Sequence, residues 1–276
     1  MSSALPLRRL RFAWPDDLDV VWIPAEPELA IAADAVSLLM PHAEPYVVSV
    51  TRAAIAEGLV PIDDPRAVAA EAYVAQEAQH HAQHRRFNEL LTARVPAVKG
   101  LDRWFAKAFA ALRRRGPRFG LAFAAAFETI AFVAARWVDR NQRLLRGAEP
   151  TAATMFLWHL AEEVEHKRVA FDTYQASGGG RLRYVAAMIT AALVLAIGSF
   201  AGTMVLLRAT GRLWRPSSHL RLARWSLSFV FVAMPVMVVS ALPGHHPDQL
   251  VDPAGLDGWL SHIDPGTATV PEWALP

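Results

Sequence analysis

The feature that most restricts the fold of this chain is a nearly repeating arrangement of glutamates and histidines. Along the sequence the order is Glu44, Glu77-x-x-His80, Glu128 and Glu163-x-x-His166. The single acid precedes the next Glu-x-x-His by 33 residues in the first half and by 35 in the second. Side chains three residues apart share one face of an α-helix. Four helices packed side by side, each contributing one part, would bring the whole set together.

The surrounding sequence contains helix signals at the required places. Asp64-Pro65 is a strong helix start, with Asp64 as N-cap, and Pro96 ends a predicted helix at about Arg94. Further helices are predicted over residues 101–115 and 119–138, and from Thr151, as a possible cap, to about Ala176. The Gly-rich turn at 177–180 then ends this part of the chain.

The segment from about residue 31 to residue 57 is predicted to form two shorter helices. Asp34 can cap the first, which would run to Met40 before Pro41 interrupts it. Pro45 is compatible with the first turn of the second helix. Glu44 would then lie at a helix start, where it could simply interact with the helix dipole. Residues 1–30, rich in proline, are interpreted as an extended arm packed on the body.

Composition narrows the chemistry. The 276-residue chain has no cysteine, which excludes disulfides, zinc–thiolate sites, iron–sulfur clusters and a cysteine nucleophile. A metal site must therefore use His, Asp and Glu, a set suited to Fe, Mn, Zn or Mg. The net charge of +2 comes with no aromatic and basic groove pattern, so no nucleic-acid partner is expected. The N-terminus lacks the apolar core of a signal peptide, and a cytoplasmic location is expected.

The repeat matches the ligand set of dinuclear carboxylate bundles, in which two helices each supply a Glu and two supply a Glu-x-x-His. Four carboxylates neutralise two divalent ions, and each imidazole completes one ion while leaving positions open. We therefore predict two metal ions, iron foremost, with Mn or Zn as alternatives. Two simpler interpretations stay open. Residues 77–84 could form a solvated polar face, and Glu128, an acid in an apolar run, could be hydrogen-bonded to a neighbouring helix.

Other ionisable residues near the repeat have less defined roles. His84 could be an outer partner of a ligand or a third imidazole of the site. His81 points about 100° away from the ligand face and is assigned to the surface or to an outer position. Glu162 and Glu165 flank Glu163 and are interpreted as solvated or salt-bridged acids rather than ligands.

Residues 35–180 resemble the ferritin-like superfamily. His159-x-x-x-Glu163-x-x-His166 is similar to the last helix of the di-iron arylamine N-oxygenases, and this resemblance implies His159 as a seventh ligand. A wider pattern resembles a bacterial family described as predicted metal-dependent hydrolases. That pattern comprises Glu44-Pro45-Tyr46, Gln76-Glu77-Ala78-x-His80, His84, Asn88 and Pro243-Gly244-His245-His246-Pro247. His245 stands where an aromatic is expected in that family, so no role is transferred to it.

Two uncharged runs follow the bundle, over residues 184–207 and 225–244. Each is long enough to cross a bilayer, and an arginine-rich loop lies between them. A membrane-associated hairpin is predicted, at the inner face of the membrane; two buried helices are the alternative. The predicted organisation is an arm (1–30), a ferritin-like metal-binding four-helix bundle (31–180), an additional apolar C-terminal helical hairpin (181–244) and a Pro-rich tail (245–276). The fold class is all-α.

Two functions are compatible with this site. The first is a di-iron oxidoreductase that uses O₂ to oxidise a small organic substrate, with an unidentified electron donor. Phe123, Phe127, Phe132 and Phe156 would keep water out, although they could equally be core residues. The alternative is a metal-dependent hydrolase that uses a metal-bound water. No G-x-S-x-G nucleophile motif is present.

Overall fold

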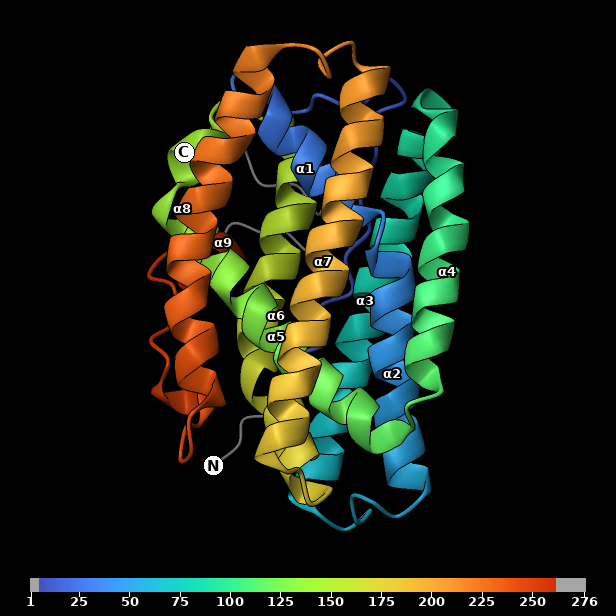
Figure 1. The fold of residues 1–276 in the computed structure, drawn as a ribbon, viewed down its shortest axis with the longest axis vertical. Helices are drawn as coiled ribbons and strands as arrows, with labels where there is room; N and C mark the ends of the chain where they lie inside the picture. Colours follow the sequence, from blue (N-terminus) through green and yellow to red (C-terminus); the bar gives the residue numbers. More distant parts are fainter. Residues whose placement is uncertain (1–4, 262–276) are drawn as a thin grey trace.

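A computed structural model describes residues 5–261, and Figure 1 shows a bundle of long helices. Four of them form its core: α2 (Met40–Ala56), α3 (Pro65–Arg94), α5 (Pro117–Arg140) and α6 (Pro150–Ala176). Helices α2 and α6 each pack against both α3 and α5. The described residues contain no strand, so the predicted all-α class is confirmed.

The remaining elements cover this core. They are α1 (Pro27–Ser37), α4 (Lys99–Arg113), α7 (Arg181–Ala209), α8 (Pro216–Ala241) and α9 (Leu256–Ser261), with the 3₁₀ turns η1 (Pro96–Val98), η2 (Gln142–Leu145) and η3 (Pro247–Gln249). Helix α7 packs on α1 and α5, and α8 packs mainly on α5. The part of the predicted tail over residues 262–276 lies outside the described residues, as do residues 1–4.

The start of α3 was predicted correctly, because the Asp64 side chain accepts a hydrogen bond from the backbone N–H of Arg66. The predicted cap of α6, Thr151, was wrong. Its N-cap is Glu149, whose carboxylate accepts from the N–H groups of Thr151 and Ala152. With Pro150 at the first helical position, the cap moves to the residue before the proline, and Thr151 lies within the helix.

Two helices do form over residues 31–57, but the predicted positions of their ends were wrong. Helix α1 already begins at Pro27, and Asp34 lies inside it, buried, where it accepts a hydrogen bond from Trp22 Nε1 at 2.9 Å. Helix α2 begins at Met40, so Pro41 occupies its first turn, where a missing N–H is tolerated. Pro45 then falls inside the helix. Glu44 is therefore not a carboxylate of the first turn, and it faces the centre of the bundle.

Residues 5–26 contain no helix, whereas residues 27–30 of the predicted arm already belong to α1. Leu10, Phe12, Leu18, Trp22 and Ile23 are buried there, and all belong to one apolar cluster with residues of α3 and α6. Burial of several large side chains fixes the position of this segment. A polar side chain next to these anchors, such as Arg8, can therefore take part in a site inside the bundle.

Gly202 lets α7 approach α1 closely, and Gly198 does the same for Leu39, which follows α1. A Cβ atom on Gly202 would lie 2.8 Å from Cβ of Ala35, and one on Gly198 would lie 2.6 Å from Cδ1 of Leu39. Neither distance is possible without movement, so glycine at these positions permits the contact. The contact holds α1, which ends at Ser37, against the bundle.

Three described helices are long and apolar enough to cross a membrane: α5, α7 and α8. The most apolar 18-residue stretch of each helix is buried to a different extent. In α5, 72% of this stretch is buried inside the protein, compared with 28% in α7 and 11% in α8. The apolar character of α5 is thus accounted for by the protein core. Most of the apolar surface of α7 and α8 is not.

Candidate metal site

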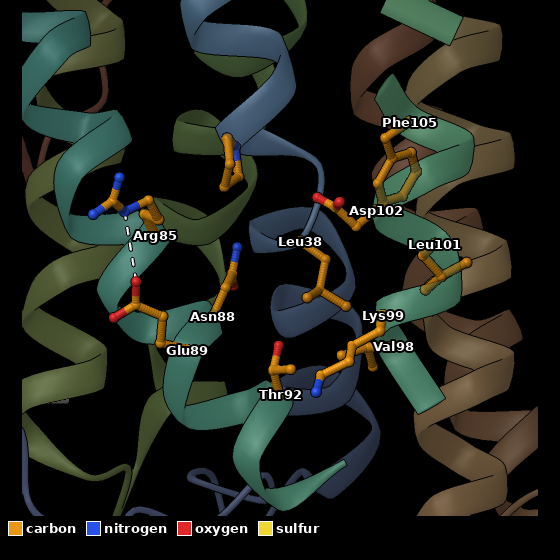
Figure 2. Close-up of a pocket in the computed structure, with 11 residues that line it drawn as sticks. Leu38, Arg85, Asn88, Glu89, Thr92, Val98, Lys99, Leu101, Asp102 and Phe105 are labelled. Atoms are coloured by element: carbon orange, nitrogen blue, oxygen red, sulfur yellow. Dashed lines mark ion pairs between the residues drawn. The ribbon is translucent and has the colours of Figure 1, made fainter. Parts of the chain in front are cut away.

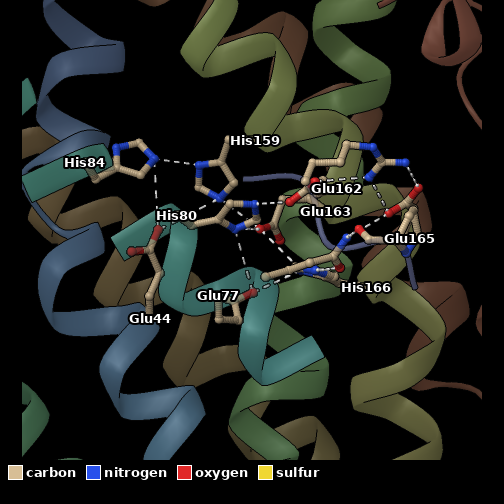
Figure 3. A network of polar contacts seen from close by, with 12 residues as sticks. Glu44, Glu77, His80, His84, His159, Glu162, Glu163, Glu165 and His166 are labelled. Atoms are coloured by element: carbon tan, nitrogen blue, oxygen red, sulfur yellow. Dashed lines mark hydrogen bonds and ion pairs between the residues drawn. The ribbon is translucent and has the colours of Figure 1, made fainter. Parts of the chain in front are cut away.

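The seven predicted ligands converge at the centre of the bundle, and Figure 3 shows most of them. Helix α2 supplies Glu44, α3 supplies Glu77 and His80, α5 supplies Glu128, and α6 supplies the other three residues. These residues include two groups that could each hold an ion. Within each group, the ligand atoms all lie within 4.8 Å of one another. The groups are Glu77, His80, Glu163 and His166, and Glu44, His80 and His159.

The first group is centred on His166. Its Nδ1 atom lies 2.9 Å from Oε1 of Glu77, 3.5 Å from Oε1 of Glu163 and 3.7 Å from Oε2 of Glu128. His80 faces the same carboxylates, since its Nδ1 atom lies 3.3 Å from Glu163 Oε1 and 4.0 Å from Glu77 Oε1. Carboxylates and imidazoles from three helices thus surround one small volume.

The second group lies one helical turn away and shares His80. Nε2 of His159 is 2.8 Å from Oε1 of Glu163 and 4.0 Å from Oε1 of Glu44. His84 approaches the same Glu44 oxygen at 3.9 Å through Nε2. The two groups are therefore contiguous, and Glu163 contacts the imidazoles of both.

Several buried polar atoms of the predicted ligands have no hydrogen-bond partner, which indicates a site for a cation. These atoms are Glu44 Oε1 and Oε2, Glu77 Oε1, His80 Nδ1, Glu128 Oε2, Glu163 Oε2 and His166 Nδ1. Buried atoms without a partner also occur on residues outside the predicted ligands, among them Tyr46 and Trp158. Buried polar groups are normally paired, and leaving them unpaired is costly. The unpaired atoms of the predicted ligands are also of the types that bind Fe, Mn or Zn, so the residues present fit a metal site.

Electrostatics indicate the same requirement for positive charge. Burial raises the pKa of Glu44 and of Glu128 well above the usual value for Glu, and the neighbouring carboxylates Glu77 and Glu163 raise it further. Burial alone would lower the pKa of His80, but its hydrogen bond with Glu162 and its contact with Glu163 outweigh this and raise that pKa to about 10. In the absence of a metal, protons partly compensate the buried negative charge.

The outer nitrogens of two histidines are held by residues anchored to Arg8 of the N-terminal arm. His80 Nε2 lies 2.9 Å from Oε2 of Glu162, and the Arg8 guanidinium donates to the other oxygen of Glu162 at 3.0 Å. Arg8 also donates two hydrogen bonds to Glu165, at 2.8 and 3.0 Å. A carboxylate that accepts from the outer nitrogen of an imidazole orients the inner nitrogen towards a metal.

The second branch from Arg8 reaches His166 through Gln76. The Gln76 side-chain amide donates to Glu165 Oε2 at 3.1 Å and to the Pro6 carbonyl at 2.8 Å. Its carbonyl oxygen can only accept, so His166 Nε2–H donates to it at 2.9 Å. The tautomer of His166 is thereby fixed, with Nδ1 directed at the carboxylates. One arginine therefore supports both histidines of the Glu-x-x-His pairs.

A second hydrogen-bond chain orients His159. The Ser37 hydroxyl donates to Oδ1 of Asn88 at 2.8 Å, so its oxygen accepts from Nδ1–H of His84, also at 2.8 Å. Nε2 of His84 then has no hydrogen and accepts from Nδ1–H of His159 at 2.6 Å. In this tautomer Nε2 of His159 carries no hydrogen, and it lies 2.8 Å from Oε1 of Glu163, where both atoms could bind one metal ion. His84 thus has the geometry of an outer partner of a ligand, one of the two roles left open by the sequence.

The two carboxylate oxygens of Glu128 have different surroundings, which match the two roles considered for it: a hydrogen bond to a neighbouring helix and a metal ligand. Its Oε1 accepts a hydrogen bond from the Tyr73 hydroxyl at 2.7 Å, which is a contact with a neighbouring helix. Its Oε2 has no such partner and faces His166. One oxygen thus fixes the side chain while the other remains available for a metal.

Sequence reasoning missed several residues that support the site. No role was predicted for Arg8, Ser37 or Tyr73. Glu162 and Glu165 do form the predicted salt bridges, but Glu162 is fully buried and also holds His80. Arg8 and Ser37 carry no local signal because their partners are 154 and 47 residues away in sequence.

A pocket lies beside this cluster rather than on it. Figure 2 shows this pocket, which lies between α3, α4 and the junction of α1 with α2. Its volume is about 510 Å³. Charged residues of both signs line it, including Arg85, Glu89, Lys99 and Asp102. It shares Asn88 with the hydrogen-bond chain of His159. Of the seven clustered residues, His159 is the most exposed, at 9%, so solvent comes nearest to the site there.

Fold and site together define an all-helical protein with a buried glutamate–histidine metal-binding cluster. A family model described as "Predicted metal-dependent hydrolase" matches residues 6–250, and the chain belongs to that family. No curated protein and no solved structure matches the chain. The family description supports metal dependence and favours hydrolysis over the oxygen activation predicted above.

Proposed function

We propose that the chain is a metal-dependent hydrolase of an ester, amide or phosphate substrate, with its metal held by Glu44, Glu77, His80, Glu128, His159, Glu163 and His166. The observation that carries the proposal is the convergence of unpartnered carboxylate and imidazole atoms on one buried volume. A bound divalent metal would supply a water of lowered pKa and would polarise the bond to be broken.

The chain itself would orient the ligands. Glu44 has both carboxylate oxygens unpartnered, so either oxygen is available to the metal. The links from Arg8 and from Ser37 hold the imidazoles in defined tautomers. His159 lies on the solvent side of the cluster and marks the side from which a substrate would approach.

The test uses chelated protein reloaded separately with Zn²⁺, Mn²⁺ or Fe²⁺ under strictly anaerobic conditions. Hydrolysis of a nitrophenyl ester and of a nitrophenyl phosphodiester is then measured. We expect at least one metal to restore turnover without oxygen, and Glu163→Gln to abolish it. Glu89→Gln, a change at an exposed acid of α3, is the matched control. Absence of turnover with every metal and both substrates would contradict hydrolysis of these bond types.

A di-iron oxidase remains the second candidate. It is favoured by the number of ligands, because seven residues in two contiguous groups exceed what one ion requires. Exposure of the Fe²⁺-loaded protein to O₂ should then produce a new absorbance band and consume oxygen. Metal analysis with anomalous scattering from a crystal would determine the identity and number of the ions. A single zinc ion with no oxygen-dependent band would exclude this candidate.

A further inference from the structure

Helices α7 and α8 carry a large exposed apolar surface, which we call the α7–α8 face. It includes Ile189, Leu193 and Phe200 on α7 and Leu227, Phe231 and Met234 on α8. Phe200 is 65% exposed and Phe231 is 77% exposed. On α7 the spacing of four and seven residues places these side chains on one stripe. Exposed apolar patches of this extent mark sites of interaction rather than ordinary surface.

The charges carried by α7, α8 and the turn between them are of one sign, and among the described residues only Arg212 and Arg221 pair with an acid, Glu28 of α1. Residues 181–247 contain seven arginines and no Asp, Glu or Lys. Arg208, Arg215 and Arg224 are exposed near the α7–α8 turn, and Arg181 and Arg183 lie at the start of α7, where Arg181 donates to the Ser240 carbonyl of α8. An apolar surface with arginine at both ends matches a membrane with anionic headgroups.

We propose that the α7–α8 face binds the surface of an anionic lipid bilayer, with α7 and α8 lying in the plane of the membrane. This proposal does not depend on the proposed function. A second copy of the chain is a poorer occupant. Because the face has arginine at both ends and no acid, pairing two such faces would bring arginines together without a counter-charge.

The opposite side of the molecule argues against a spanning arrangement. In Figure 1, α8 and α4 lie at opposite edges of the bundle. Helices α3 and α4 expose Arg86, Glu89, Asp102, Arg103 and Lys107 to solvent. Charged side chains facing lipid are expensive, so this side must remain in water. Since α7 and α8 are packed on the same bundle, only one side of the protein can enter the bilayer.

The first test is flotation of the full chain with vesicles. We expect binding to phosphatidylcholine vesicles in which about a third of the lipid is phosphatidylglycerol, and weaker binding to pure phosphatidylcholine. The double variant Phe200→Ser/Phe231→Ser should bind about tenfold more weakly or worse, as should Arg215→Glu/Arg224→Glu. Because these side chains are exposed, the thermal unfolding of all variants should stay close to that of the wild type.

Matched control variants change similar residues elsewhere. Ile62 and Val68 are 81% and 69% exposed and lie outside the face, so Ile62→Ser/Val68→Ser should bind normally. Arg86→Glu/Arg103→Glu is the corresponding charge control. Failure of the wild type to bind anionic vesicles would overturn the proposal. So would a stable oligomer that binds no vesicles and is dissociated by the two serine substitutions, since a second copy would then cover the face.

A second experiment tests orientation, and the absence of native cysteine makes it direct. Single cysteines replace Leu182 and Leu193, which lie about 16 Å apart along α7 on the same side of the helix. Each is labelled with an environment-sensitive fluorophore and quenched by lipids that carry a nitroxide at a known depth. Equal depth at both positions supports helices lying in the plane. A difference close to the separation along the helix would show a spanning helix and overturn the proposed orientation.

Discussion

Nε2 of His84 lies 2.6 Å from Nδ1 of His159, and this hydrogen bond joins α3 to α6 beside the candidate metal site. Its direction follows from Ser37, which donates to Asn88 and can therefore only accept from His84. Burial lowers the pKa of His84 well below the usual value for His, which keeps it a neutral acceptor. The nitrogen of His159 nearest the carboxylates is consequently available as a ligand.

Replacing His84 should weaken metal binding without removing a ligand. We expect His84→Phe to raise the metal Kd about 10- to 100-fold, because His159 loses the acceptor that fixes its tautomer. His84→Gln should restore much of the affinity, since the amide oxygen can accept the same hydrogen bond. Competition with a chromophoric chelator measures both constants. Unchanged affinity in His84→Phe would show that this hydrogen bond does not support the site.

Arg8→Ala should also weaken metal binding, although Arg8 is distant in sequence from every candidate ligand. Its removal leaves Glu162 and Glu165 without their cationic partner and loosens the links to both histidines. We expect a Kd raised about 10- to 100-fold, with a largely intact fold in circular dichroism. Arg9→Ala, at the exposed neighbouring position, is the control. Equal Kd values for the two variants would contradict the role given to Arg8.

Removal of Glu128 or Glu163 tests the ligand assignment directly. Each should lower the number of metal ions bound per chain, since each carboxylate has an unpartnered buried oxygen aimed at the cluster. Glu128→Ala and Glu163→Ala are compared by metal analysis after dialysis, with Glu89→Ala as the surface control. Full metal retention in both variants would refute the assignment.

Metal binding should tighten as the pH rises and should release protons. The pKa of His80 is raised to about 10, so at pH 7.5 its imidazole is protonated in the metal-free protein and must lose a proton to bind a metal. Titration calorimetry in buffers of different ionisation enthalpy counts the released protons. A Kd that is independent of pH between 6.5 and 10, with no proton release, would contradict this assignment.

The raised pKa of His80 also makes the stability of the metal-free protein depend on pH. A raised histidine pKa contributes stability that is fully present below about pH 6.5 and is lost as the pH rises to about 10. The pKa of His166 is also raised, because its contacts with Glu163, Glu128 and Glu77 outweigh the effect of burial, and it acts in the same direction. The difference in Tm between metal-loaded and metal-free protein should therefore widen over this range.

Gly202→Ala should destabilise the fold by about 1–3 kcal/mol, because the new methyl group would overlap Ala35 of α1, including its backbone. Gly198→Ala should cost less, since the nearest atom belongs to the flexible Leu39 side chain. Gly100→Ala on α4 meets nothing within 4 Å and should be slightly stabilising. Urea unfolding ranks the three variants. A neutral Gly202→Ala would show that the α1–α7 contact is not tight.

Much of the architecture could be read from local signals. Asp64-Pro65, Pro96 and the Gly-rich turn at 177–180 set helix ends through backbone chemistry that acts within a few residues. The register around Pro41 and Pro45 could not be read in this way. The packing of α1 and α2, rather than the prolines alone, decides where those helices begin. The ferritin-like resemblance and the predicted domain boundaries remain predictions.

The sequence by itself determined the candidate ligands, because helical spacing places Glu77 with His80, and Glu163 with His166, on single helix faces. Only the tertiary structure decided how those side chains are held. Arg8, Ser37 and Tyr73 reach the cluster from three different elements, over separations of 154 residues for Arg8 to Glu162 and 55 for Tyr73 to Glu128. Periodicity describes one helix at a time, whereas hydrogen bonds between elements depend on how the helices pack together.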